Sequence, residues 1–179
     1  MFLRLLPLLL MFSLLQAGLP PGRPLPDVPI ARPDGRNIDL KQYRGKAVVL
    51  MIFGTTCADC YETLALLDRM QGQYAPQGLQ VVAAASEPNA ASALTVWFKR
   101  NNKPYPVGYL EVAPYQKIAN TKPNAPGHLP VLLFIDPKGM VRVQLFGDDP
   151  LMKKPELVMR RTIEELLKEV PQAASSAKR

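Results

Sequence analysis

Two continuous apolar runs, separated by a segment of helical character, most strongly limit what this chain can fold into. Residues 47–53 and 80–85 are rich in valine, isoleucine, leucine and alanine, which is typical of strands buried on both faces. Between them, residues 57–74 carry apolar side chains at helical spacing, and Gly72 and Pro76 mark the end of that helix. We therefore expect a βαβ unit with parallel central strands, which belongs to an α/β fold.

The C-terminal half predicts the rest of the sheet. Residues 130–135 form a third apolar strand, 136–139 a tight turn, and 140–146 a strand that returns antiparallel. A final amphipathic helix is predicted over 156–170. Its side chains expected to face the core are Leu157, Ile163, Leu166 and Leu167. Together these elements predict a mixed, mainly parallel sheet flanked by helices, with an insertion at residues 87–126 between the second and third core strands.

The first residues have the composition of a secretory signal peptide. Arg4 carries the only early charge, residues 5–15 are almost wholly apolar, and Ala17 is a small residue at a suitable cleavage point. We therefore expect residues 1–17 to be removed and the protein to be exported, to a periplasm or an equivalent oxidising compartment. An uncleaved membrane anchor is the alternative, but a span needs about 20 apolar residues, and this run is shorter and contains Pro7.

The remaining chain divides into three parts by composition. Residues 18–33 form an extended, proline-rich lead, 34–170 a single domain, and 171–179 a small, polar tail expected to be disordered. With 179 residues and 47% hydrophobic content, the chain buries a core without covalent staples. Its net charge of +7 comes from basic residues scattered among acids, with no aromatic and basic platform, so no nucleic-acid partner is expected.

The chain has only two cysteines, Cys57 and Cys60, and they lie where the first buried strand meets its helix. At that position free backbone N–H groups and the positive end of the helix dipole stabilise a thiolate. Cys60 is one turn along, so it can reach the Cys57 sulfur and resolve a mixed disulfide. The spacing predicts a dithiol for disulfide exchange, with Cys57 as nucleophile and Cys60 as resolving group.

Four other uses of these cysteines can be weighed from the sequence. A zinc site needs four ligands and the chain offers only His128 besides the pair, while a structural disulfide across one turn closes almost no loop. A copper-binding metallochaperone using Cys57, Cys60 and His128 is the main alternative, because thiolate and imidazole suit copper. A thiol peroxidase is less favoured, since Gly54 and Leu50 stand where peroxiredoxins have threonine and proline.

The ordered motifs resemble one family. The segments that carry the resemblance are Gly45-Lys46 with the apolar strand after it, Phe53-Gly54-Thr55-Thr56-Cys57-Ala58-Asp59-Cys60, Gly78-Leu79-Gln80-Val81-Val82 and Leu129-Pro130-Val131-Leu132-Leu133-Phe134-Ile135-Asp136-Pro137-Lys138-Gly139. Over about residues 22–170, the chain resembles thioredoxin-like reductases of the TlpA/ResA type. The resemblance implies a thioredoxin fold, a redox-active disulfide at Cys57 and Cys60, and no organic cofactor. It also implies exported protein disulfides as substrates and an upstream thiol reductant; cytochrome c maturation is one role of that family. We expect a monomer.

Three further residues are candidates for the site. In the resembled family a proline that opens the third strand has a cis peptide bond and faces the dithiol, and Pro130 matches its position. The exposed backbone of Leu129 could then pair with an extended partner peptide. Family members also carry a glutamate after the second strand, which makes Glu87 a candidate proton carrier or else an ordinary loop acid or helix cap. His128 either faces the dithiol, where it would stabilise a thiolate, or is an exposed loop residue.

The motif departs from the family at the residues around the cysteines. Thr56 replaces the usual tryptophan, and Ala58 and Asp59 stand where the family often has proline. Asp59 places a negative charge beside the sulfurs, which disfavours the thiolate and, by linkage, the reduced state. A relatively reducing couple, suited to donating electrons, is therefore expected.

Overall fold

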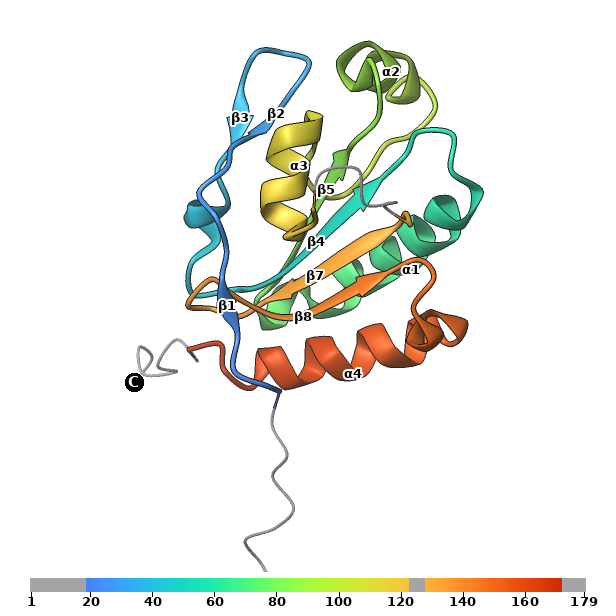
Figure 1. Cartoon of the computed structure of the whole chain (residues 1–179). Helices are drawn as coiled ribbons and strands as arrows, with labels where there is room; N and C mark the ends of the chain where they lie inside the picture. Colours follow the sequence, from blue (N-terminus) through green and yellow to red (C-terminus); the bar gives the residue numbers. More distant parts are fainter. Residues whose placement is uncertain (1–18, 123–127, 172–179) are drawn as a thin grey trace, which may run out of the picture.

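The structure, a computed structural model, describes residues 19–122 and 128–171 (Figure 1). The predicted signal peptide, residues 1–17, lies outside the described residues, as do residues 172–179 of the predicted tail. None of the described helices is long and apolar enough to cross a membrane.

The predicted βαβ unit forms the centre of the molecule. Strand β4, Ala47–Phe53, is buried along its whole length, as its continuous apolar run requires. Helix α1, Ala58–Tyr74, follows it and leads to strand β5, Leu79–Ala85, which pairs parallel to β4. Strand β7, Val131–Ile135, lies antiparallel on the other side of β4. The strand predicted at residues 47–53, which is β4, therefore lies in the centre of the sheet as expected.

Further strands extend the sheet on both sides. Strand β8, Met140–Phe146, returns from β7 through the predicted tight turn, and β6, Val107–Tyr109, pairs parallel to β5. The segment between β5 and β7 holds α2, Ala90–Trp97, then β6, then α3, Val112–Ala119, so the predicted insertion supplies a strand of its own. The sheet is mixed, as predicted, but its parallel part is limited to β4, β5 and β6.

The proline-rich lead is built into the edges of the sheet. Strand β1, Arg23–Pro24, pairs antiparallel with β8, and β2, Ile30–Ala31, pairs with both β6 and β3, Asn37–Ile38. The strand order is β1-β8-β7-β4-β5-β6-β2-β3. The lead therefore pairs with β8 on one side of the sheet and with β6 on the other, so these two strands are not left as open edges.

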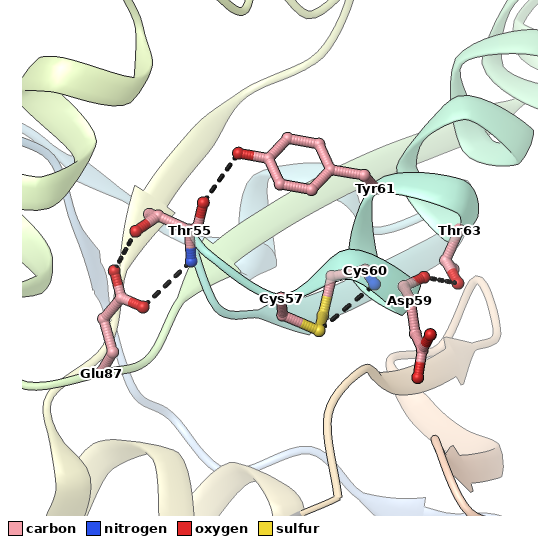
Figure 2. The surroundings of a disulfide bond; sticks show 7 residues. All are labelled: Thr55, Cys57, Asp59, Cys60, Tyr61, Thr63 and Glu87. Carbon is pink, nitrogen blue, oxygen red and sulfur yellow. Dashed lines mark hydrogen bonds between the residues drawn. A yellow bond between two sulfur atoms is a disulfide. The ribbon is translucent and has the colours of Figure 1, made fainter.

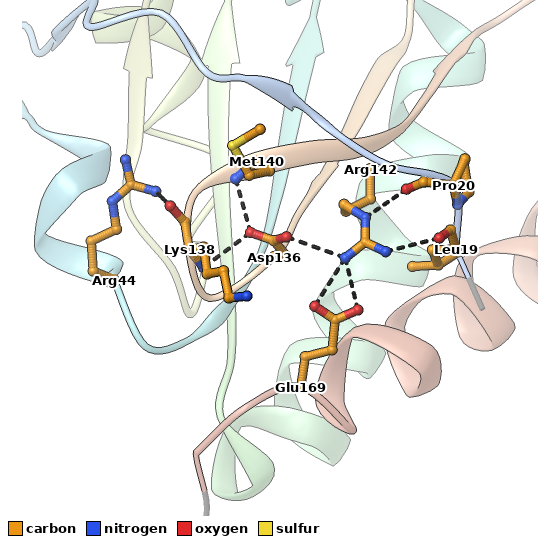
Figure 3. Close-up of polar contacts among 8 residues, drawn as sticks. All are labelled: Leu19, Pro20, Arg44, Asp136, Lys138, Met140, Arg142 and Glu169. Atoms are coloured by element: carbon orange, nitrogen blue, oxygen red, sulfur yellow. Dashed lines mark hydrogen bonds and ion pairs between the residues drawn. The ribbon is translucent and has the colours of Figure 1, made fainter.

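Arg142 holds the start of this lead in place (Figure 3). Its guanidinium donates hydrogen bonds to the carbonyl oxygens of Leu19 and Pro20 at 2.8 and 2.7 Å. It also pairs with the buried carboxylate of Asp136 and with Glu169 beyond the last helix. One side chain therefore ties the lead, the β7–β8 turn and the C-terminal segment together.

Helices cover both faces of the sheet (Figure 1). Helices α1, α2 and α4, Pro155–Leu167, contribute to the core on one face, and Ile118 of α3 contributes to the core on the other. The short 3₁₀ helices of the described chain are Leu40–Tyr43, Ala75–Gln77 and Pro150–Lys153.

The final helix corrects one detail of the sequence interpretation. Ile163 and Leu166 are buried as predicted, but Leu157 is 43% exposed and Met159 is fully buried in its place. Each residue turns the helix by about 100°, so residues two apart point to nearly opposite sides. The true inward face contains Met159, and Leu157 cannot share it.

Candidate active site

The two cysteines form a disulfide where β4 gives way to α1 (Figure 2). Their Cα atoms are 5.2 Å apart, within the range that one disulfide spans. The pair lies beyond the carboxyl end of a buried parallel strand, where α/β sheets place their reactive groups. The expected location of the dithiol is therefore observed.

The two sulfurs differ in exposure and in backbone setting. Cys60 is fully buried, at 0% exposure, whereas Cys57 is only partly buried. Cys57 is also the N-cap of α1, and its sulfur accepts a hydrogen bond from the backbone N–H of Cys60 at 3.2 Å. That N–H and the helix end favour a thiolate at Cys57 once the disulfide is reduced. Cys57 is thus both the more accessible and the better stabilised nucleophile.

Three hydrogen bonds hold Thr55 in the loop before Cys57 (Figure 2). Its backbone N–H donates to the Glu87 carboxylate at 3.0 Å, and its hydroxyl donates to the other oxygen of the same carboxylate. Its carbonyl oxygen accepts a hydrogen bond of 2.7 Å from the hydroxyl of Tyr61 on α1. The sequence interpretation missed Thr55 and Tyr61, because no local pattern shows that a loop residue and a helix residue clamp each other.

Gly54 lies between Cys57, Glu87 and Leu129. A Cβ at this position would lie 3.4 Å from the Cys57 Cβ, from a Glu87 carboxylate oxygen and from a Leu129 methyl group. The structure therefore places Glu87 and the residue before Pro130 beside the dithiol loop. Thr56, by contrast, is exposed, and its hydroxyl bonds no sulfur within the described part of the chain.

Pro130 lies directly before β7, which begins at Val131, and its peptide bond with Leu129 is cis, as the resemblance implied. Within the described residues, neither the N–H nor the carbonyl of Leu129 has a hydrogen-bond partner. The neighbouring backbone at Gly147 approaches so closely that a Cβ there would lie 2.4 Å from the Leu129 oxygen. The backbone N–H and carbonyl of Leu129 are thus without a hydrogen bond next to the disulfide loop, and the carbonyl oxygen packs against Gly147.

His128 lies on an exposed loop beside Asp148. Its side chain is 54% exposed, and its Nε2 lies 3.6 Å from a carboxylate oxygen of Asp148. Among the residues that the structure describes, no group of three or more histidine, cysteine, aspartate or glutamate side chains is arranged to hold a metal ion. The geometry accordingly gives no support to the copper alternative and places His128 on an exposed loop.

Sequence comparison identifies relatives of known chemistry. Residues 21–144 match the AhpC/TSA family. The thiol-disulfide oxidoreductase ResA of Bacillus thuringiensis (strain Al Hakam) is 26% identical over 127 residues, which are 71% of this chain and 70% of that protein. ResA of Halalkalibacterium halodurans is 34% identical over a shorter stretch of 56 residues, or 31% of this chain and 32% of the relative.

Solved structures agree with the fold described above. A putative thiol:disulfide interchange protein DsbE from Chlorobium tepidum has a TM-score of 0.66 at 22% identity, covering 83% of this chain and 99% of the other. A putative protein disulfide isomerase from Bacteroides thetaiotaomicron has a TM-score of 0.65 at 18% identity, covering 84% and 92%. The chain therefore belongs to the AhpC/TSA family, has a thioredoxin-like fold and is a thiol-disulfide oxidoreductase.

Proposed function

We propose that this protein is exported and reduces disulfides in other exported proteins, with Cys57 as nucleophile and Cys60 as resolving group. The observation that carries the assignment of roles is the difference between the two sulfurs: Cys57 is partly exposed at a helix N-cap, and Cys60 is fully buried behind it. Export rests on the signal-like composition of residues 1–17.

Exchange proceeds in two steps that balance. The Cys57 thiolate attacks one sulfur of the substrate disulfide, which forms a mixed disulfide and releases the other substrate sulfur as a thiolate. The Cys60 thiolate then attacks the Cys57 sulfur, which closes the disulfide of this protein and releases the second substrate thiol. Two electrons and two protons pass to the substrate, and an upstream thiol reductant restores the dithiol.

Two neighbouring groups support these steps. The free N–H and carbonyl of Leu129 pair with an extended segment of the substrate and hold its disulfide against Cys57. The Glu87 carboxylate, beside the loop at Gly54, takes up or delivers a proton as the thiols change state. If so, Glu87→Gln alters the pH profile of turnover, whereas a purely structural role leaves its shape unchanged and lowers stability alone.

A peroxidase reaction lacks its activating group here. Gly54 offers no hydroxyl three residues before Cys57, and the hydroxyl of Thr55 is donated to Glu87. Reduction of protein disulfides therefore accounts better for the residues that surround the sulfur.

The trapping experiment tests the proposal directly. Cys60→Ser cannot resolve the mixed disulfide, so we expect it to accumulate disulfide-linked adducts with oxidised exported proteins. Dithiothreitol should reduce these adducts and release the partner proteins. Cys57→Ser is the matched control, since it keeps one cysteine but lacks the nucleophile and should trap nothing. Adducts on Cys57→Ser but not on Cys60→Ser would reverse the assigned roles, and adducts on neither would contradict exchange.

A further inference from the structure

A groove lies beside the disulfide and is not used by the exchange steps described above. It has a volume of about 370 Å³ and runs between α1 and the segment that joins β8 to α4. Helix α1 lines one wall with Asp59, Glu62, Leu66 and Arg69, whose spacing of three or four residues places them along one side of the helix. The groove is therefore a continuous strip that begins at the dithiol and follows the helix away from it.

The groove is connected to the reacting sulfurs at one end. Asp59 lies between the two cysteines in the sequence, and Pro130, which also lines the groove, directly follows Leu129. A substrate segment that pairs with the Leu129 backbone would therefore place its neighbouring side chains in this groove. On the opposite wall Gly147 and Met152 leave room for the stem of a long side chain.

The charges of the groove differ from those of the whole chain. Asp59 and Glu62 are exposed, and within the described part of the chain neither carboxylate pairs with a basic side chain. In Figure 2 the Asp59 carboxylate points away from Thr55 and Glu87, with no bond drawn to it. Arg69, at the far end, is already paired with Glu156 at 3.4 Å. The end of the groove near the dithiol thus carries two unpaired negative charges, although the chain has a net charge of +7.

We propose that this groove selects disulfide substrates that carry lysine or arginine in the extended segment next to the attacked cysteine. A basic side chain that enters from the dithiol end of the groove brings its charge to Asp59 and Glu62, which line that end. The inference rests on the proposed reductase function and adds a substrate class to it. It also opposes the net charge, which by itself would favour acidic substrates through long-range attraction.

Two synthetic peptide disulfides test the selection. They are identical except that the residues flanking the cysteine are lysine in one and glutamate in the other, and kcat/KM is measured for each with the reduced protein. We expect the lysine peptide to react about two- to thirtyfold faster, the range for two exposed ion pairs. The variant Asp59→Asn with Glu62→Gln should lose this preference. Any change in redox potential that Asp59→Asn causes affects the rates with both peptides equally, so it does not alter the ratio of the lysine-peptide rate to the glutamate-peptide rate.

A matched control removes the same charge elsewhere. Asp27→Asn with Asp34→Asn deletes one exposed carboxylate in the lead and one directly after it; these pair with Lys41, Arg32 and Arg36 and do not line the groove. This variant should keep the preference for the lysine peptide. Equal rates for both peptides in the unmodified protein, or a preference that survives in the groove variant, would overturn the inference. Failure to reduce either peptide would instead contradict the proposed function itself.

Discussion

Gly147→Ala offers a sharp test of how the Leu129 backbone contributes to turnover. The N–H of Gly147 donates to the carbonyl of His128 at 2.9 Å, which holds the two segments together. An added Cβ would lie 2.4 Å from the Leu129 oxygen and 2.8 Å from its carbonyl carbon, both of them backbone atoms. Since Cβ atoms essentially never approach closer than 3.0 Å, the backbone must separate by about 0.6 Å, the difference between 3.0 and 2.4 Å.

The expected effects have different sizes for stability and for activity. Overpacking of this kind costs about 1–3 kcal/mol in the free energy of unfolding, and each kcal/mol lowers Tm by about 2–4 °C for a chain of this length. Because the displaced atoms are those that we propose hold the substrate, kcat/KM for a peptide disulfide should fall by about 10- to 100-fold.

Gly108→Ala separates the two effects. A Cβ at Gly108 would lie 2.4 Å from the backbone oxygen of Ala31, so it meets the same steric conflict at the β2–β6 edge of the sheet. We expect a similar loss of Tm, measured by thermal unfolding, with unchanged kcat/KM. If Gly147→Ala loses stability but reduces the peptide at the original rate, then pairing through Leu129 is refuted.

Three further changes give measurable outcomes. Asp59→Asn should raise the redox midpoint by about 10–20 mV in a thiol titration, because it removes a charge that disfavours the thiolate; an unchanged or lower midpoint would contradict this. Gln71→Ala should cost about 1–3 kcal/mol in urea unfolding, because the Gln71 side chain accepts the buried N–H of Val81 at 2.7 Å. Burial and the hydrogen bond to Asp68 raise the pKa of Tyr105. The stability that its protonated hydroxyl contributes to the folded state is therefore present below the unfolded pKa of about 10 and is lost as the pH rises above that value. Tyr105→Phe should therefore show a shallower alkaline loss of stability, and an identical pH profile would count against this pairing.

The sequence by itself determined the fold class and the place of the dithiol. The continuous apolar run at 47–53 indicated a strand covered on both faces, and the helix predicted after it places Cys57 at its N-terminus, where the structure has Cys57 as the N-cap of α1. Both conclusions depend on local periodicity and on the chemistry of a helix N-terminus, which a short stretch of residues contains in full. The tight turn after β7 is equally local and was predicted for the same reason.

Tertiary structure alone decided how distant residues meet. The clamp of Glu87 and Tyr61 on Thr55 joins a loop, a helix and the end of another strand, and no spacing in the sequence encodes it. Likewise, the exposure of Leu157 and the pairing of His128 with Asp148 depend on which surface the neighbouring elements leave open. A periodic pattern shows that a helix has an apolar side, but the packing of the whole chain selects the partners of each side chain, because burial depends on all the elements together.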